Sequence, residues 1–486
     1  MYTEISPGTK EDDPTNEKKI AAMVDVWAAL HREELVRDIS RLIAVKSVCD
    51  YGGDGYPMGK GCHEAAEYMT KLGRQYGFHS EHDDYCVSIL HPGTEGKHEL
   101  GLLCHLDVVP EGGGWKHDPW QAVEKDGWLI GRGSADNKGP AVTALYVLRC
   151  MKELGLALKS DLRLIAGCDE ENDMRDVQHY LAQHEAPVYT LNCDGAWAAC
   201  IGEKGIFAAD LIQRIEDGSL IAIGGGSASN TVPDSAYAVL PHASEEALEK
   251  TKQLCPDVQL ERQEEGVLLR VKGKSAHCFV PHLGENAIVR LIRLLCEADL
   301  LTGEAAIALA RLRQCFADDY GTGLRIQHED SISGKTTCVP SLIRFCKGEL
   351  RQHINVRYAL TQKGAFLQKS LEKRLAKLHI AHEVLEHTPP RYDPADDPIV
   401  SMLIENCQTH LGRQHKPYVM GGGTHSRLFP RSIPYGPGVM DPRVRNSFGD
   451  PHGPEEAVCI EQLIQAVKVY VIALLKLDER FYASIS

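Results

Sequence analysis

Residues 100–110 read LGLLCHLDVVP, an apolar run that ends in a histidine, an aspartate and a proline. The run is short and mostly apolar, which predicts a buried β-strand over residues 100–109. In open α/β sheets, ligands bind at the carboxyl ends of the strands. His105 and Asp107 are therefore the first candidates for a functional site.

The sequence after this strand alternates between helical and strand-like patterns. A helix is expected over residues 139–154, because apolar side chains recur on one face. Strands are expected over 162–166 and 188–191, with a helix through 177–183 between them. This alternation is typical of a doubly wound, largely parallel sheet, so the predicted fold class of the main domain is α/β.

The middle of the chain has a different pattern. Residues 201–391 contain shorter strand-like runs and two long helical patterns, at 286–301 and 363–378. Such a mixture predicts an inserted α+β lid domain. We therefore expect a catalytic domain built from residues 1–200 and 392–486, interrupted by the lid domain at 201–391.

Helical patterns also occur near both ends of the chain. Towards the N-terminus, apolar residues recur at three- and four-residue steps over 24–42, and a second helix is expected over 62–77. Towards the C-terminus, helices are expected over 399–411 and 456–475.

Composition excludes several classes of protein. The chain has 486 residues, with 53 Lys and Arg, 68 Asp and Glu, and a formal net charge of −15, which disfavours nucleic acid as a partner. The longest apolar run, at 469–475, is shorter than the roughly 18 residues that a membrane helix needs. Residues 1–19 are polar rather than a signal peptide, and the 16 cysteines lack paired spacing. These features predict a cytoplasmic protein with neither nucleic-acid nor membrane partners.

Histidine and acidic side chains are concentrated where the three predicted strands end. These ends read CHLD at 104–107, CDEE at 168–171 and NCDG at 192–195, and a loop at 131–139 reads GRGSADNKG. The carboxyl ends of parallel strands meet at one edge of a sheet. Imidazole and carboxylate groups gathered there are what a divalent metal ion requires. The sequence therefore predicts a metal site at this edge.

The spacing within these motifs adds detail. His105 and Asp107 are two residues apart on a strand, so both side chains leave the same face and the carboxylate can orient the imidazole. Glu170 and Glu171 are adjacent and point in different directions. One of the two could bind a metal while the other acts as a base. Carboxylates crowded together are costly without a cation, which also favours a metal.

A single histidine is more often a hydrogen-bonded structural residue than a metal ligand. We apply that interpretation to the histidines outside this ordered set, including His63, His117, His282 and His328. The cysteines beside the candidate ligands are interpreted as buried, inert thiols: Cys104, Cys168 and Cys193.

Further motifs follow in a fixed order along the chain. In the first part these are HLDVVP at 105–110, GWLIGRG at 127–133, DNKG at 136–139, DEE at 169–171 and NCDG at 192–195. In the remainder they are SNTVPD at 229–234, GKSAH at 273–277, GENA at 284–287, GGGT at 421–424 and His452. Together they span nearly the whole chain beyond about residue 25. This set resembles the M20 metallopeptidase family, in particular its PepV-like dipeptidase branch.

The resemblance implies a site with two divalent metal ions, with Zn²⁺ expected first and Mn²⁺ or Co²⁺ as alternatives. The implied metal ligands are His105, Asp136, Glu171, Asp194 and His452, with Asp136 bridging the ions. It further implies that Asp107 orients His105. Glu170 is implied as the general acid and base that activates a metal-bridging water for attack on the scissile carbonyl.

The resemblance also implies substrate contacts. From the lid, His277 and Asn230 are expected to stabilise the oxyanion, and Arg357 to bind the free carboxylate of the substrate through its two-pronged guanidinium. Gly423 and Thr424 are expected to contact the substrate from the glycine-rich loop.

Two features indicate which member of the family this chain resembles. Asp194 stands where the peptidases of the family usually have Asp and the deacylases Glu, and the long lid is similar to that of monomeric members. We therefore expect a monomeric dipeptidase acting on small peptides. The alternatives are an N-acyl-amino-acid amidohydrolase and a non-catalytic metal- or peptide-binding protein. One departure from the branch is His425, which stands where Tyr is common.

Overall fold

The computed structural model describes residues 14–52, 55–438 and 448–483, so most of residues 1–19 lie outside the described part. The chain divides into two compact units. Unit 1 consists of residues 1–201, 393–418 and 423–486, and unit 2 consists of residues 202–392 and 419–422. Each unit has its own hydrophobic core.

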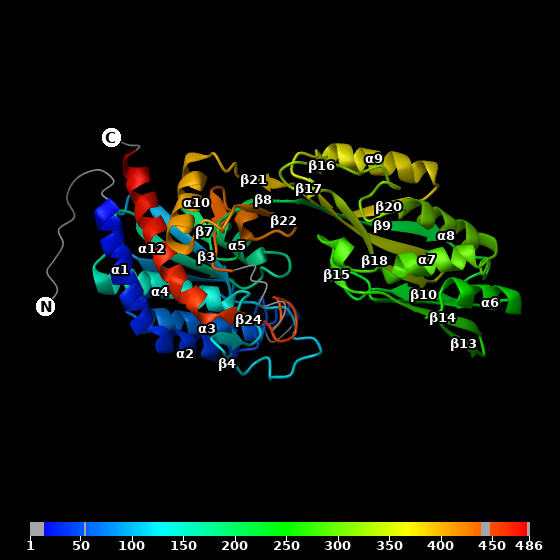
Figure 1. Ribbon diagram of the computed structural model, residues 1–486, viewed down its shortest axis with the longest axis horizontal. Coiled ribbons are helices and arrows are strands. Elements are labelled where there is room, and N and C mark those ends of the chain that lie inside the picture. Colours follow the sequence, from blue (N-terminus) through cyan, green and yellow to red (C-terminus); the bar gives the residue numbers. More distant parts are fainter. Residues whose placement is uncertain (1–13, 53–54, 439–447, 484–486) are drawn as a thin grey trace. The chain divides into compact units, whose positions relative to one another are not determined.

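A six-stranded sheet forms the centre of unit 1 (Figure 1), with the strand order β1-β2-β6-β3-β7-β23. The strands are β1 (His79–His82), β2 (Cys86–His91), β3 (Glu99–His105), β6 (Asp161–Gly167), β7 (Tyr189–Asn192) and β23 (Ser432–Pro434). β3 is parallel to β6 and β7, and β23 is parallel to β7. β1 and β2 form an antiparallel hairpin at one edge, which the sequence pattern did not predict.

Helices cover both faces of this sheet. They include α3 (Lys60–Gln75), α4 (Lys138–Leu154), α5 (Arg175–Gln183), α10 (Pro398–Leu411) and α12 (Ile460–Ala483). Leu102 and Leu164 belong to the large core that contains residues of α3, α4, α10 and α12. Leu103 and Ile165, their neighbours in sequence, pack on the opposite face with α5, because successive side chains of a strand alternate between faces. The doubly wound α/β fold is thereby confirmed.

The predicted single helical pattern at 24–42 is wrong in one respect. The segment forms two helices, α1 (Pro14–Leu30) and α2 (Arg32–Ile43). His31 separates them with φ −99° and ψ 6°, and its Nδ1 lies 2.7 Å from the carbonyl oxygen of Trp27. A side chain that engages a carbonyl of the preceding turn competes with regular helix propagation.

The predicted C-terminal helix at 456–475 begins later than expected. Residues Ala457–Cys459 instead form strand β24, which pairs with β5 (Trp128–Ile130), and β5 pairs with β4 (Val123–Lys125). α12 starts at Ile460, packs against α1 and α4, and contains the apolar run at 469–475. Among the described residues, no helix combines the length and apolar character needed to cross a membrane.

Unit 2 is built on an eight-stranded sheet with the order β13-β14-β12-β10-β18-β19-β9-β20. Its strands are β9 (Gly205–Arg214), β10 (Ala222–Gly225), β12 (Ser235–Leu240), β13 (Gln259–Gln263), β14 (Gly266–Lys272), β18 (Thr337–Cys346), β19 (Glu349–Tyr358) and β20 (Ala381–Thr388). All neighbours in it are antiparallel. Its helices are α6 (Glu245–Leu254), α7 (Ala287–Glu297), α8 (Gly303–Cys315) and α9 (Gly364–Lys377). The helix predicted at 286–301 ends earlier, at Glu297, and α8 is additional.

Replacement of a core residue of the central sheet tests the packing of unit 1. Leu164 is fully buried in β6, between β2 and β3. We expect Leu164→Ala to lower the free energy of unfolding by about 2–5 kcal/mol, because the substitution leaves a cavity that the sheet cannot close. Urea unfolding followed by circular dichroism measures the change. Leu30→Ala, at a position that is 77% exposed, is the control and should change stability by less than about 0.5 kcal/mol. Equal losses for both variants would contradict the assigned packing.

Candidate metal and catalytic site

The candidate site lies where parallel strands of unit 1 end. His105 is the last residue of β3, Glu170 and Glu171 follow β6, and Asp194 follows β7. Because β3 pairs in parallel with both β6 and β7, these three chain segments emerge at the same edge of the sheet. Asp136 reaches the same place from the loop that precedes α4.

Asp136 lies between two histidines. Its Oδ1 is 2.9 Å from His105 Nε2, and its Oδ2 is 3.2 Å from His452 Nε2. His452 Nε2 is also 3.1 Å from the Glu171 carboxylate. Asp136 thus links the two histidines, with one carboxylate oxygen directed to each.

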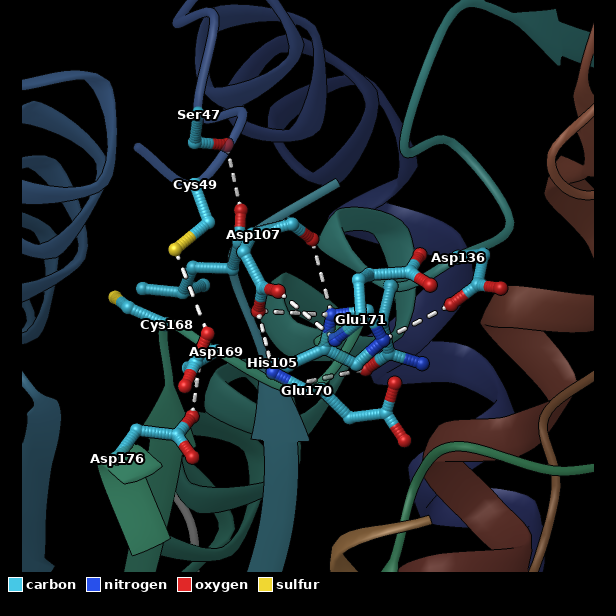
Figure 2. A network of polar contacts seen from close by, with 12 residues as sticks. Ser47, Cys49, His105, Asp107, Asp136, Cys168, Asp169, Glu170, Glu171 and Asp176 are labelled. Atoms are coloured by element: carbon cyan, nitrogen blue, oxygen red, sulfur yellow. Dashed lines mark hydrogen bonds and ion pairs between the residues drawn. The ribbon is translucent and has the colours of Figure 1, made fainter. Parts of the chain in front are cut away.

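Two groups of side chains in this region have ligand atoms close enough to hold a metal ion. One consists of His105, Asp136 and Glu171, which are labelled in Figure 2, and the other consists of His105, Glu170 and Asp194. The ligand atoms in each group lie within 4.8 Å of one another. The predicted ligands His105, Asp136, Glu171 and Asp194 are thus brought together, and His452 joins them through Asp136 and Glu171.

Asp107 connects the ends of two strands. Its carboxylate oxygens accept the backbone N–H groups of Glu170 and Glu171, at 3.1 and 3.0 Å. Its Oδ1 also lies 3.4 Å from His105 Nδ1, and its backbone oxygen is 3.0 Å from the same nitrogen. The side chain is fully buried. Asp107 therefore orients both glutamates as well as the imidazole.

A buried ion pair that the sequence reasoning missed supports Asp136 and His452. Arg132 donates to Glu456 Oε2 at 2.6 Å, and Glu456 Oε1 accepts the N–H groups of Ala135 and Asp136, both at 3.0 Å. Arg132 also donates to the backbone oxygen of His452 at 3.2 Å. The sequence contains little indication of this pair, because Arg132 and Glu456 are 324 positions apart.

His425 belongs to a second layer of buried polar contacts. Its Nε2 lies 3.1 Å from Asp176 Oδ1, and Asp176 Oδ2 accepts the N–H of Asp169 at 2.8 Å. Asp169 in turn accepts a hydrogen bond from Tyr51 at 2.6 Å. His425 and Asp176 are both nearly completely buried. His425 thus holds, through Asp176, the backbone of Asp169, which precedes Glu170.

The electrostatics of the site reflect an excess of acidic groups. Burial, reinforced by the charge of Asp194, raises the pKa of Glu170 well above its usual value. Burial and the Asp136 charge raise the pKa of Asp194 to about 7 and also raise that of Glu171. Burial alone would lower the pKa of His452, but its hydrogen bonds to Asp136 and Glu171 raise it to about 11. Such crowding favours the binding of cations.

The predicted substrate contacts are divided between the units. His277 and Asn230 lie together in unit 2, where His277 pairs with Thr231 across strands β15 (Ala276–His277) and β11 (Thr231–Val232). The backbone oxygen of Asn230 accepts the N–H of Cys278 at 2.9 Å. His277 itself is exposed.

Arg357 is buried in unit 2. Its Nε donates to Asn355 Oδ1 at 2.9 Å and its Nη1 donates to the Gly421 backbone oxygen at 3.2 Å. Gly423 and Thr424 belong to unit 1, where Thr424 Oγ1 accepts the N–H of Ser426 at 3.2 Å.

Comparison with known proteins identifies relatives. Residues 101–476 match the family model described as Peptidase family M20/M25/M40. A Bacillus subtilis (strain 168) protein named "Putative dipeptidase YtjP" is 30% identical over 460 residues, which cover 92% of this chain and 97% of that protein. A Staphylococcus epidermidis protein named "Putative dipeptidase" is 28% identical over 460 residues, which cover 91% of this chain and 97% of that protein.

Two solved structures share the fold. Human carnosine dipeptidase 1 aligns with a TM-score of 0.59 and 14% identity, covering 95% of this chain and 99% of that one. The dipeptidase Dug1p from Saccharomyces cerevisiae aligns with a TM-score of 0.57 and 12% identity, and the alignment covers 94% of this chain and 98% of that one.

Metal binding at this site is expected to release protons. Without metal, His105 and His452 have raised pKa values and carry protons near neutral pH, and Asp194, with a pKa of about 7, is about half protonated there. A metal binds the deprotonated forms, so its affinity should fall as the pH is lowered through 7. Calorimetric titration of the stripped protein with Zn²⁺, in buffers of different ionisation enthalpy, counts the protons released. The His452→Ala variant should release fewer protons on binding Zn²⁺ than the wild type. Binding without proton release would contradict the assignment of these ligands.

Proposed function

Because this chain belongs to the peptidase family M20/M25/M40 and is a hydrolase that acts on peptide bonds, we propose that its substrates are dipeptides with a free C-terminal carboxylate. The observation that carries the proposal is the position of Asp136 between His105 and His452. The names of the two bacterial relatives, both described as dipeptidases, support the substrate class.

The residues present fit a pair of divalent ions. We propose that the ions are held by His105, Asp136, Glu171, Asp194 and His452. A donor set of two imidazoles and three carboxylates suits Zn²⁺ first, with Mn²⁺ or Co²⁺ as alternatives. When bound, such cations polarise the scissile carbonyl and lower the pKa of water.

Glu170 is the proposed general base and acid. Its backbone N–H is held by Asp107, and burial together with the charge of Asp194 raises its pKa, so its carboxylate is a stronger base than that of an ordinary glutamate. The carboxylate takes the proton from the attacking water and then gives it to the leaving amine. Glu171, held by the other oxygen of Asp107, is directed to His452 instead, which separates the two roles.

Residues of unit 2 are proposed to recognise the substrate. His277 Nδ1 accepts the N–H of Phe279 at 3.1 Å, which leaves the proton on Nε2, where it can donate to a developing oxyanion together with Asn230. Arg357 is proposed to bind the substrate carboxylate. From unit 1, Gly423 and Thr424 are proposed to contact the substrate backbone.

A cytoplasmic monomer is the proposed state of the protein. All 16 cysteines are free thiols, which is the usual state in a reducing compartment. The long insertion at 202–392 supports a monomer, as expected from the sequence.

Hydrolysis of a panel of dipeptides, N-acetyl amino acids and longer peptides tests the substrate class. The metal-stripped protein should regain activity with added Zn²⁺ or Mn²⁺ and should cleave the dipeptides, because only these carry both a free amine and a free carboxylate on the residues that flank the scissile bond. N-acetyl amino acids keep the carboxylate but lack the amine, and longer peptides place at least one of the two groups further away. Cleavage confined to the N-acetyl compounds would instead establish an amidohydrolase. Metal binding without any turnover would establish a non-catalytic binding protein.

Substitution of Glu170 tests the mechanism. Glu170→Gln keeps the size of the side chain but removes the proton acceptor, so kcat should fall by about 10²–10⁴-fold while the metal content stays unchanged. Steady-state kinetics and elemental analysis measure the two quantities. Asp173→Asn, at a nearby position with a 68% exposed side chain, is the matched control and should behave as the wild type. Near-normal turnover of Glu170→Gln would contradict its role.

A further inference from the structure

A second cluster of histidine and carboxylate side chains lies outside the candidate active site. His63 is on α3, His82 is the last residue of β1, and Asp84 lies in the turn between β1 and β2. All three precede the residues matched by the family model, which begin at 101. The sequence reasoning treated His63 as an ordinary structural histidine, because the other two residues are brought to it only by the fold.

The two imidazoles converge on one carboxylate oxygen. His63 Nδ1 lies 2.6 Å from Asp84 Oδ1, and His82 Nδ1 lies 3.2 Å from the same oxygen. The three ligand atoms are within 4.8 Å of one another. Nitrogen and oxygen ligands of a tetrahedral zinc site, about 2.0–2.2 Å from the metal, have spacings of this order between them.

Hydrogen bonds within this cluster leave one ring nitrogen, His82 Nδ1, without a partner. His63 Nδ1 forms a hydrogen bond with Asp84, whereas His82 Nδ1 is buried and, although it lies 3.2 Å from Asp84 Oδ1, forms no hydrogen bond among the described residues. A buried polar atom without a partner is costly and requires an explanation such as an ion. A cation held by all three side chains supplies the missing partner.

The local structure holds these side chains in place. Asp83 Oδ1 accepts the N–H groups of Tyr85 and Cys86 at 3.1 and 2.9 Å, which fixes the turn. Asp84 adopts a left-handed backbone conformation, with φ 67°, within that turn. The His63 ring stacks on Tyr56, with ring centroids 4.0 Å apart and planes 17° from parallel. Ligands fixed in this way lose little freedom on binding a metal.

The cluster is also accessible. The side chains of His63, His82 and Asp84 are 22%, 19% and 30% exposed, so an ion can enter from solvent and keep a water ligand. Glu67 is one helical turn from His63. The Lys71 hydrogen bond and, to a smaller extent, the two imidazoles lower the pKa of Glu67, which keeps negative charge beside the cluster.

We propose that His63, His82 and Asp84 form a zinc site separate from the candidate active site. Two imidazole nitrogens and one carboxylate suit Zn²⁺, whereas Ca²⁺ and Mg²⁺ prefer sites made of oxygen ligands. The fourth ligand is water. The bound ion fastens α3 to the β1–β2 hairpin at the edge of the central sheet, so its role is structural. This inference does not depend on the proposed dipeptidase activity.

Zinc content of purified variants tests the proposal. The full-length protein is saturated with ZnCl₂, freed of loosely bound metal by gel filtration, and analysed by mass spectrometry of the elements. We expect His82→Ala and Asp84→Asn each to contain one zinc ion per chain fewer than the wild type, with unchanged hydrolysis of dipeptides. His79→Ala is the matched control, because His79 is on the same strand but exposed, and it should keep the wild-type zinc content. Wild-type zinc content in His82→Ala and Asp84→Asn would overturn the proposal.

A second measurement applies even if the substitutions impair folding. Crystals of the wild-type protein grown with zinc are measured at the zinc absorption edge. An anomalous difference peak between His63, His82 and Asp84 is the expected result, and its absence from zinc-saturated crystals would overturn the proposal.

Discussion

Repulsion among carboxylates at the ends of β3 and β6 is the constraint on which the candidate site depends. Parallel pairing of these strands brings the backbone of Glu170 and Glu171 to the Asp107 carboxylate, and burial together with the charges of Asp194, Glu171 and Asp136 raises the pKa of Glu170. The fold offsets part of this cost by directing two backbone N–H groups at Asp107. The remaining negative charge meets two histidines, His105 and His452, through Asp136. The site is therefore built to gain stability when positive charge is added.

The buried ion pair of Arg132 and Glu456 lies next to this site and positions two of its residues. A buried ion pair gives little net stability, because both charges lose their hydration. This pair also forms hydrogen bonds to the backbone. Glu456 accepts two backbone N–H groups of the loop that carries Asp136, and Arg132 donates to the backbone oxygen of His452. It joins segments more than 300 residues apart and so fixes the backbone of Asp136 relative to that of His452.

Much of the α/β fold was predictable, because it rests on local signals. Apolar runs bounded by polar residues marked β3, β6 and β7, and the acidic motifs that follow them marked one edge of the sheet. The parts that were not predicted depend on distant pairing. The hairpin of β1 and β2 is short and begins with the polar sequence HSEH, β24 exists because it pairs with β5, and the link from Arg132 to Glu456 has no local signature. The roles of individual site residues still rest on the resemblance and on geometry together.

The two histidine–carboxylate clusters of unit 1 differ in the number of carboxylates they hold relative to histidines. Around Asp136, the acidic side chains outnumber the histidines. Glu170 is one of them, and its carboxylate is the proposed proton acceptor rather than a proposed metal ligand. Around Asp84, two imidazoles share a single carboxylate, so an ion bound there would use all three of these side chains as ligands. In the proposed active site, metal binding would leave Glu170 available as a proton acceptor. In the proposed zinc site, all three side chains would be metal ligands. Under the two proposals, the same residue types would support hydrolysis at the carboxyl ends of the parallel strands and rigidity at the edge hairpin.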